Sequence, residues 1–420
     1  MDQIFVQGGK KLRGSIKISG AKNSALPILV LGLLSNDTCV VQNVPNLQDI
    51  NTMKQLLKSL GVEIRFEQNK LFMNLLTLSS YKAKYDLVRK MRASILVLGP
   101  LLAKFGKAEV SLPGGCAIGS RPVDMHLSAL EKMGAKIKIE DGYIKGMVSG
   151  NSLKAAKISF SRVSVGATEN TIMAATLASG TTLIENAALE PEIDDLIEVL
   201  IKMGAKISRT KPGCIQITGV KKLSGFDHTI MPDRIEAGTY AIAAAITGGK
   251  LELIDAPNNN LKALIDYLRK IGVNIIEYSD GIEVDAPEKL SSSNLTTEVY
   301  PGFPTDLQAQ AMALMTISEG VSSIEEQIFE NRFMHVSELL RFGANIKITG
   351  NKAIIKGTKN LNGAQVMATD LRASSSLVLA GLRAKGETVI NRIYHLDRGY
   401  ENLVQKLSQC GAVIKRVKKN

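Results

Sequence analysis

The sequence has few of the residues that build metal centres, disulfide frameworks or stacking surfaces. Among its 420 residues there is no Trp, 5% are aromatic, and there are only four Cys and four His. The cysteines lie far apart without paired spacing, which argues against a disulfide framework and against a zinc site. We therefore expect no metal and no other cofactor.

Long apolar runs are also missing. The longest ones, residues 25–34 and 95–103, are shorter than the roughly 18 to 20 residues that a membrane-spanning helix needs. The first residues, 1–5, lack a basic region followed by an apolar core, so they do not indicate a secretion signal. These features predict a cytoplasmic protein without membrane insertion.

Positive charge is in excess. A formal net charge of +12 favours anionic partners, which include nucleic acids, acidic lipids and phosphorylated metabolites. The only tight basic cluster is residues 415–419, and the low aromatic content makes a stacking platform for single-stranded nucleic acid improbable. A chain of 420 residues exceeds one compact core, so two or more domains are expected.

An internal repeat is the most informative pattern in the chain. Six segments share the order Gly, then Ala or Val, then any residue, then Ile, and they recur about every 70 residues. They begin at Gly61, Gly134, Gly204, Gly272, Gly343 and Gly411. Six such units account for the whole chain.

Each repeat predicts the same elements. Apolar residues one and four positions before each glycine, such as Leu60 and Leu57, mark one face of a helix, and the glycine suits a left-handed helix end. Alternating residues then predict a strand, as in 135–139. Cys410 takes the place of Leu60 in its repeat, so we expect a buried thiol there. A second helix, rich in small and apolar residues, is expected at residues 24–34, 93–103, 170–178, 238–246, 307–317 and 373–382.

Polar residues stand at the starts of these apolar helices. They are Lys22, Arg92, Thr168, Glu236, Asp306 and Arg372. Helix N-termini present unpaired N–H groups and a positive dipole end, which suit phosphate and carboxylate groups. Each residue alone is more typical of a cap or a surface group, but Lys22, Arg92 and Arg372 together favour an anion site.

Two further segments each allow two interpretations. Residues 111–122 place Cys116 among three glycines, which indicates either a turn with an incidental thiol or a mobile loop whose thiolate Arg121 favours. In residues 303–307, Asp306 or Thr305 could cap a helix, or Asp306 could act as a general base. Spacing does not separate these interpretations.

Several longer segments resemble one family, the UDP-N-acetylglucosamine 1-carboxyvinyltransferases. The similarity covers essentially the whole chain. The matching segments are GAKNSALP at 20–27, LPGGC at 112–116, RPVD at 121–124, FPTDLQAQ at 303–310, FENRFMH at 329–335, ATDLRA at 368–373 and HLDRGYE at 395–401.

This resemblance implies an α/β fold of two inside-out α/β barrels, each made of three repeats, with the active site in the interdomain cleft. It implies one domain at residues 22–229 and a second formed by residues 1–21 and 230–420. Periodicity alone would not reveal that crossover of the first strand.

The resemblance also implies roles for individual residues. Lys22, Arg121 and Arg398 would hold the phosphate and carboxylate of phosphoenolpyruvate, with Arg92, Arg332 and Arg372 nearby, because planar guanidinium groups suit such anions. Asn23 and Asp306 would contact the sugar of UDP-N-acetylglucosamine, and Ile328 would line the same site. The uridine diphosphate would be bound by Arg121, Pro122, Val123, Asp124, Met125, Arg162, Val163, Ser164 and Val165. Some relatives carry lysine in place of Arg162, which keeps the charge.

The implied reaction is an addition followed by an elimination. The sugar 3'-hydroxyl attacks C2 of phosphoenolpyruvate while C3 gains a proton, and phosphate then leaves as C3 loses one. Asp306 would accept the hydroxyl proton, and Cys116 would donate to C3, form a covalent adduct or assist release. This is the first committed step of peptidoglycan synthesis.

Two other functions are weighed against this one. 5-Enolpyruvylshikimate-3-phosphate synthase resembles the fold and uses the same donor, but the 113–116 and 121–124 segments favour the nucleotide-sugar enzyme. A non-catalytic repeat scaffold or nucleic-acid binder would use the repeats only as surface. The joint presence of Lys22, Asn23, Cys116, Asp306, Arg372 and Arg398 argues against that.

Overall fold

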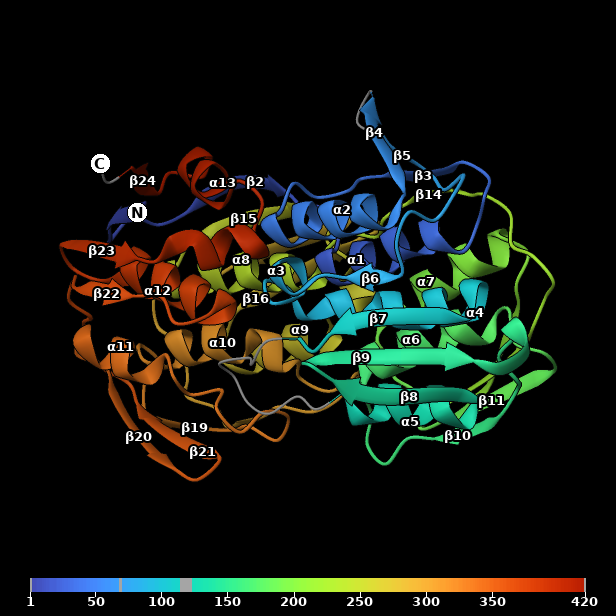
Figure 1. Cartoon of the computed structure of the whole chain (residues 1–420). Coiled ribbons are helices and arrows are strands. Elements are labelled where there is room, and N and C mark those ends of the chain that lie inside the picture. Colours follow the sequence, from blue (N-terminus) through green and yellow to red (C-terminus); the bar gives the residue numbers. More distant parts are fainter. Residues whose placement is uncertain (1, 68–69, 114–122, 419–420) are drawn as a thin grey trace. The chain divides into compact units, whose positions relative to one another are not determined.

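The computed structural model describes residues 2–67, 70–113 and 123–418 (Figure 1). It divides into two compact units. The first unit contains residues 20–113 and 123–231, and the second contains residues 2–19 and 232–418. Each unit has its own hydrophobic core and three four-stranded sheets.

The first unit is built from the first three repeats. Its strands are β3 (Cys39–Gln42), β4 (Glu63–Glu67), β5 (Lys70–Asn74), β6 (Lys82–Ala83), β7 (Lys107–Ser111), β8 (Ala135–Glu140), β9 (Tyr143–Val148), β10 (Lys157–Ser159), β11 (Thr181–Glu185), β12 (Lys206–Lys211), β13 (Cys214–Thr218) and β14 (Asp227–Thr229). Its α-helices are α1 (Lys22–Val30), α2 (Gln48–Leu60), α3 (Tyr85–Val88), α4 (Leu98–Phe105), α5 (Asp124–Lys132), α6 (Val165–Ala175) and α7 (Pro191–Lys202). Short 3-10 turns are η1 (Leu31–Leu33), η2 (Arg92–Val97) and η3 (Ser149–Asn151).

The second unit is built from the last three repeats and the N-terminal strands. Its strands are β1 (Gln3–Gln7), β2 (Arg13–Lys17), β15 (Lys250–Ile254), β16 (Asn274–Tyr278), β17 (Gly281–Asp285), β18 (Leu295–Thr296), β19 (Val321–Glu325), β20 (Asn345–Thr349), β21 (Lys352–Lys356), β22 (Gln365–Met367), β23 (Glu387–Asn391) and β24 (Val413–Val417). Its α-helices are α8 (Arg234–Thr247), α9 (Lys262–Lys270), α10 (Gln308–Met315), α11 (Val336–Arg341), α12 (Leu371–Arg383) and α13 (Leu403–Gln409). Short 3-10 turns are η4 (Asn258–Asn260), η5 (Thr305–Leu307) and η6 (Ile393–Arg398).

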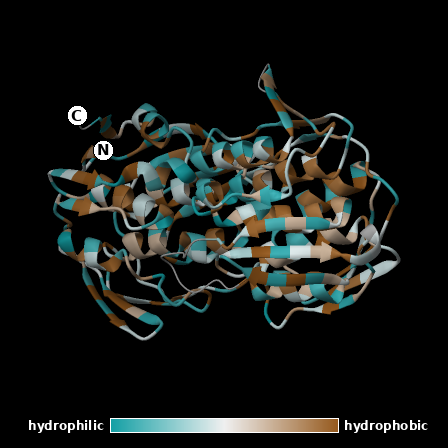
Figure 2. Cartoon of the chain, in the orientation of Figure 1, coloured by the Kyte–Doolittle hydropathy of each residue, from teal (hydrophilic) through white to brown (hydrophobic). Residues whose placement is uncertain are grey.

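All six sheets share one topology. In the third repeat, β10 pairs in parallel with β11, which pairs antiparallel with β13, and β12 pairs antiparallel with β13 at the other edge. Hydrophobic and hydrophilic residues alternate along many of these strands, as Figure 2 shows, which is the pattern of a sheet with one face toward a core. The repeat predicted from the sequence is therefore one sheet with two helices.

The N-terminal strands complete sheets of the later repeats. β1 lies between β23 and β24 and is antiparallel to both, so Phe5 faces Val389 on one side and Lys415 on the other. β2 pairs in parallel with β15. In the first unit, β14 comes from the end of the third repeat but pairs with β3 of the first repeat. These exchanges close each set of three repeats.

The apolar helices predicted from the sequence lie in the cores. Every residue of α8 is buried, and α1, α4, α6, α10 and α12 are buried along most of their length. The amphipathic helices end as expected, because all six repeat glycines have a left-handed φ, such as +113° at Gly61 and +92° at Gly134. Cys410 is buried, as its repeat position predicts. Across residues 2–67, 70–113 and 123–418, no helix is both long and apolar enough to cross a membrane.

Two of these glycines predict different costs of substitution. A Cβ at Gly61 would lie 2.7 Å from Ser79 N and 2.7 Å from Thr77 O, whereas a Cβ at Gly134 meets no atom within 4 Å. Gly134→Ala should therefore lower the free energy of unfolding by about 1 to 2 kcal/mol, the cost of left-handed backbone alone. Gly61→Ala should cost more. Urea unfolding of both variants tests this, and equal midpoints would contradict the role given to the close contact.

Candidate active site

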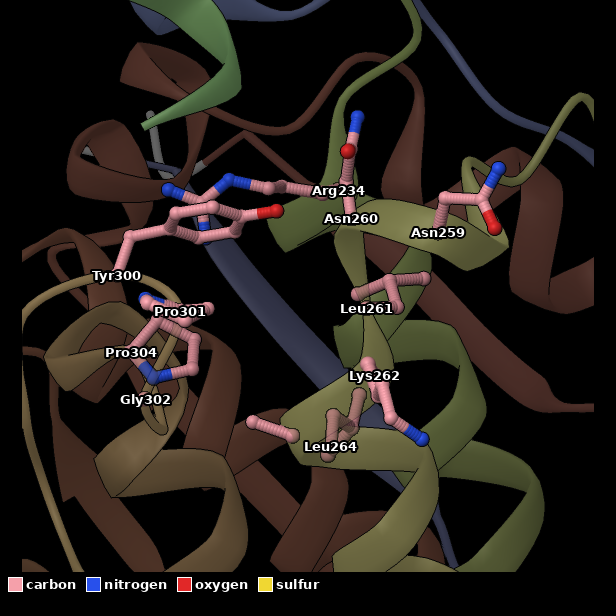
Figure 3. A pocket seen from close by; sticks show the side chains of 11 residues that line it. Arg234, Asn259, Asn260, Leu261, Lys262, Leu264, Tyr300, Pro301, Gly302 and Pro304 are labelled. Atoms are coloured by element: carbon pink, nitrogen blue, oxygen red, sulfur yellow. The ribbon is translucent and has the colours of Figure 1, made fainter. Parts of the chain in front are cut away.

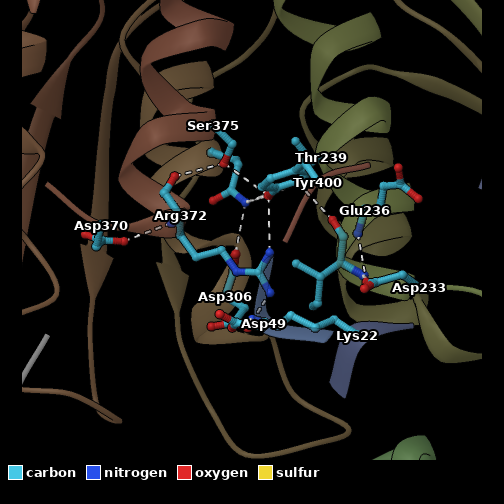
Figure 4. A network of polar contacts seen from close by, with 12 residues as sticks. Lys22, Asp49, Asp233, Glu236, Thr239, Asp306, Asp370, Arg372, Ser375 and Tyr400 are labelled. Carbon is cyan, nitrogen blue, oxygen red and sulfur yellow. Dashed lines mark hydrogen bonds and ion pairs between the residues drawn. The ribbon is translucent and has the colours of Figure 1, made fainter. Parts of the chain in front are cut away.

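The carboxylate of Asp306 lies between two buried arginines in the second unit. Arg332 Nη2 donates to Asp306 Oδ1 at 2.7 Å, and Arg372 Nη2 donates to Oδ2 at 2.8 Å. Both arginines are only 5% exposed. Figure 4 shows Arg372 pointing toward Asp306. Buried charges are costly unless they are paired, and this cluster pairs two cations with only one anion. The excess positive charge suits an additional anionic ligand.

Local structure explains how these side chains meet. Asp306 is in η5, which leads directly into α10, and Arg372 is the second residue of α12. α12 is capped by Asp370, whose side chain accepts from the N–H groups of Arg372 and Ala373. The N-cap positions of η5 and α10 are Pro304 and Leu307, and neither makes a side-chain cap. Asp306 pairs with the two arginines, and Thr305 Oγ1 donates to Glu326 at 2.9 Å.

Tyr400 connects this cluster to three core helices. Its hydroxyl accepts from Arg372 Nη1 at 3.3 Å and from Gln310 Nε2 at 3.1 Å, and it donates to Ser375 at 3.1 Å. Thr239 of α8 is 2.9 Å away, as drawn in Figure 4. Burial opposes the charge of Arg372, but the nearby Asp306 carboxylate prevails and raises its pKa above the ordinary value.

Glu326 fixes the segment that carries Ile328. Its Oε1 accepts from the backbone N–H of Ile328 at 2.8 Å and from that of Phe329 at 3.1 Å. Glu326 is itself buried. A carboxylate that accepts two backbone N–H groups holds a turn firmly, so Ile328 has a defined place beside the Thr305–Asp306 turn.

In the first unit, Lys22 begins helix α1 and pairs with Asp49. Lys22 Nζ lies 3.4 Å from Asp49 Oδ2, and both side chains are buried. Asn23 is half-buried. Arg92 begins η2, and its charge acts on His126. Burial and, to a smaller extent, Arg92 lower the pKa of His126 to about 4, although Asp124 opposes both.

The residues expected to bind the uridine diphosphate have mixed exposure. Val123 and Met125 are buried at the start of α5, and Asp124 is exposed there. Arg162 is exposed, and the half-buried 163–165 segment leads into α6, which Ser164 caps through the Ala167 N–H. Three expected site residues, Cys116, Arg121 and Pro122, lie outside the described residues.

Arg398 ends η6 in the second unit and is half-buried. Burial lowers the pKa of the nearby His395, and Arg398 lowers it further while Asp370 raises it. Asp370 also acts on His335, so the cap of α12 lies close to two histidines. The starts of the buried helices therefore carry the predicted polar residues, and the second unit brings Asp306, Arg332 and Arg372 into direct contact.

A small cavity of about 100 Å³ lies in the second unit beside the turn that precedes Asp306. Pro304, Tyr300 and the start of α9 line it, and Arg234 lies over the ring of Tyr300 at 5.5 Å (Figure 3). Sequence reasoning gave no indication of this cavity. Among residues 2–67, 70–113 and 123–418, no group of three His, Cys, Asp or Glu side chains is arranged to hold a metal ion.

Sequence reasoning missed several residues that support the site. Asp49 was not expected, because a carboxylate on an amphipathic helix usually faces solvent. Tyr400 and Gln310 lie inside segments that match the family, at 395–401 and 303–310, so their place in those segments was the available signal. Nothing in their spacing indicated the bonds that join them.

The buried histidine His335 predicts a loss of stability in acid. Its pKa is lowered to about 4, chiefly by burial; Asp370 opposes the shift, and Arg332 contributes to it. The ordinary value is 6.5, so between these limits the unfolded chain binds more protons and stability falls as the pH falls.

For this one residue, the free energy of unfolding should change with pH by at most about 1.4 kcal/mol per pH unit. Urea unfolding between pH 7.5 and 5 should show it, and His335→Gln should remove about that much of the slope. The pKa values of His126 and His395 are lowered as well, so these two residues should still contribute to the pH dependence in the variant. An unchanged slope in the variant would contradict the assignment.

Comparisons with known proteins agree with this architecture. The model of the EPSP synthase (3-phosphoshikimate 1-carboxyvinyltransferase) family matches residues 6–407. In structure, the chain is similar to the enolpyruvyl transferase NikO from Streptomyces tendae, with a TM-score of 0.89 and 22% identity over 100% of this chain and 99% of that one. It is also similar to EPSP synthase from Acinetobacter baumannii, with a TM-score of 0.77 and 18% identity over 100% of both chains. These two likenesses establish the fold.

Sequence identity is much higher with one group of enzymes. The chain is 55% identical to the UDP-N-acetylglucosamine 1-carboxyvinyltransferase of Granulibacter bethesdensis, over 99% of this chain and 100% of the relative. It is 52% identical to the enzyme of that name from Geobacter metallireducens, over 100% of both. The chain therefore belongs to the UDP-N-acetylglucosamine 1-carboxyvinyltransferase family, built on the fold that this family shares with EPSP synthases.

Proposed function

We propose that the chain transfers the enolpyruvyl group of phosphoenolpyruvate to the 3'-hydroxyl of UDP-N-acetylglucosamine and releases phosphate, the first committed step of peptidoglycan synthesis. The observation that carries this proposal is the 52–55% identity to relatives of that name along the full length. The shikimate-dependent alternative is supported by the match to the EPSP synthase family model and by an 18% identical fold relative, and no relative of comparable identity carries that name among those compared above. We place the reaction in the cytoplasm.

The buried cations are the proposed binding groups for phosphoenolpyruvate. Lys22, Arg121 and Arg398 hold its phosphate and carboxylate, and Arg92, Arg332 and Arg372 lie nearby. Arg332 and Arg372 are desolvated and paired with one carboxylate, which supports strong binding of a further anion. Asn23, Ile328 and Asp306 contact the sugar, while residues 121–125 and 162–165 bind the uridine diphosphate.

Asp306 is the proposed proton acceptor for the 3'-hydroxyl. Both of its oxygens now accept from guanidinium groups, at 2.7 and 2.8 Å. Phosphoenolpyruvate supplies competing anionic oxygens, so the arginines exchange partners and leave a carboxylate oxygen for the hydroxyl proton. The same arginines then stabilise the charge of the tetrahedral intermediate and of the leaving phosphate.

Cys116 is proposed to act at C3 of phosphoenolpyruvate, as proton donor, covalent nucleophile or aid to release. The other cysteines make poor competitors for this role. Burial raises the pKa of Cys39 to about 12 and raises that of Cys410 above its ordinary value, and Cys214 is buried as well. A thiol with so few thiolate ions and so little access reacts slowly.

We also propose that the two units fold as separate three-repeat domains. Their expected bounds are 22–229 for one and 1–21 with 230–420 for the other. The separate hydrophobic cores support this division, because each encloses the buried helices of its own three repeats.

Phosphate release from phosphoenolpyruvate tests the reaction directly. We expect release with UDP-N-acetylglucosamine and none above background with shikimate 3-phosphate. The enolpyruvyl product should carry the new ether bond at the sugar 3'-oxygen, which mass spectrometry and NMR can locate. Release with shikimate 3-phosphate alone would overturn the proposal.

Replacing Asp306 by Asn tests the proton acceptor. The amide keeps the shape of the side chain but is a poor base, so turnover should fall by about 10² or more. Binding of UDP-N-acetylglucosamine, measured by calorimetry, should persist. The matched control is Glu277→Gln, because Glu277 also pairs with an arginine, Arg269, at 2.9 Å, but on the surface. Turnover within a few fold of the wild type in Asp306→Asn would leave Asp306 only a positioning role.

A further inference from the structure

In the first unit, a series of hydrogen-bonded polar side chains begins on α1, two residues after Lys22. Ser24 Oγ of α1 donates to Asp195 Oδ2 of α7, and His228 Nε2 of β14 lies 2.9 Å from Asp195 Oδ1. Lys202 Nζ lies 3.1 Å from His228 Nδ1. Ser24, Asp195 and His228 are all buried, and Lys202 is partly exposed and pairs with Glu198 at 2.8 Å.

These contacts determine where the imidazole proton lies. A lysine ammonium group has donors and no acceptor, so His228 Nδ1 must accept from Lys202. The proton of the neutral ring is then on Nε2 and is donated to Asp195. Asp195 consequently accepts from both His228 and Ser24, and this satisfies a buried carboxylate from two sides.

The repeat fold does not require this carboxylate. At the same distance before the repeat glycine, the other five repeats carry Thr52, Met125, Ala263, Met334 and Asn402. Nor does it require a paired serine: Ser94 lies two residues after Arg92, as Ser24 lies two residues after Lys22. Ser94 is buried, yet its hydroxyl has no hydrogen-bond partner within the described part of the chain. The chain of contacts is therefore specific to the helix that begins with Lys22.

The first turn of α1 is held at three points. Its N-cap residue, Ala21, donates its N–H to the Met231 carbonyl at 2.7 Å, and no side chain of the described residues caps it. Asp49 holds the ammonium of Lys22 at 3.4 Å. Asp195 holds the hydroxyl of Ser24, on the turn that carries Lys22. We expect that removing the last contact keeps the buried helix in place and loosens its first turn.

We propose that Asp195, oriented by His228, is a positioning residue that sets Lys22 for binding the anionic groups of phosphoenolpyruvate. The inference rests on the proposed role of Lys22 in that binding. Lys22 begins a buried helix whose N-terminus lacks a side-chain cap, so its direction depends on what holds the first turn. An ammonium group held away from its binding position contributes less to holding a small anion, because misplaced binding groups lose part of their effect.

Ser24→Ala and Ser94→Ala form the matched pair that tests this. Ser24→Ala should raise the KM for phosphoenolpyruvate about three- to tenfold, the scale of one hydrogen bond, with a smaller change in kcat. Ser94→Ala removes a hydroxyl of equal burial and equivalent position without breaking a contact, so its KM should stay within about twofold. Equal effects of the two variants would overturn the proposal.

Two substitutions of His228 distinguish a hydrogen-bonding role from a role in packing alone. In His228→Gln the amide N–H can still donate to Asp195, whereas His228→Leu keeps apolar bulk and loses the donor. If the hydrogen bonds of His228 and Asp195 position Lys22, the KM of the Gln variant stays closer to that of the wild type than the KM of the Leu variant does. If His228 only fills the core, the Leu variant performs better and the proposal is wrong. Urea midpoints of both variants show whether a kinetic change reflects unfolding.

Lys22→Ala distinguishes this inference from the proposed function. A large rise in its KM for phosphoenolpyruvate, with wild-type kinetics in Ser24→Ala, would contradict the positioning role of Asp195 and leave the anion role of Lys22 intact. An unchanged KM in Lys22→Ala would instead contradict the anion role itself, on which the positioning role depends.

Discussion

The polar chemistry of this protein depends on one constraint: its core helices are enclosed by the sheets of their own unit. Every residue of α8 is buried, and α1 exposes little beyond Asn23. A charged side chain in the middle of such a helix would lose its hydration and would need a paired partner, whereas neutral polar side chains such as Thr239 and Gln310 are hydrogen-bonded to each other. Charged residues are therefore concentrated at the helix starts, where free N–H groups and the helix dipole are also found.

The enclosure also forces these charges to form pairs. Lys22 contacts Asp49, and Asp306 contacts both Arg332 and Arg372; all of these side chains are buried except that of Asp306, which is partly exposed. Such pairs contribute little net stability compared with apolar packing, since desolvation offsets most of the attraction. In the proposed function their value is catalytic, because an anionic substrate would meet desolvated cations that are already oriented.

Much of the fold could be predicted from residues, and much of the site could not. The six glycines predicted the helix ends, and the apolar segments predicted the core helices, because both signals are local. The partners of Asp306 are 26 and 66 residues away, so no local pattern indicates those contacts. The burial of Asp49 and the place of β1 between β23 and β24 likewise depend on tertiary packing. For Cys116 and Arg121, the family resemblance is the basis of the assignment.

In the proposed mechanism, Asp306 exchanges its hydrogen bonds with the two arginines for a hydrogen bond with the sugar 3'-hydroxyl when substrates bind. A crystal structure of the complex with UDP-N-acetylglucosamine and a non-reactive phosphoenolpyruvate analogue measures this directly. We predict an Asp306 oxygen within about 3 Å of the 3'-oxygen, with at least one guanidinium turned to the analogue. A 3'-hydroxyl out of reach of Asp306, with both arginines still on its carboxylate, would contradict the account.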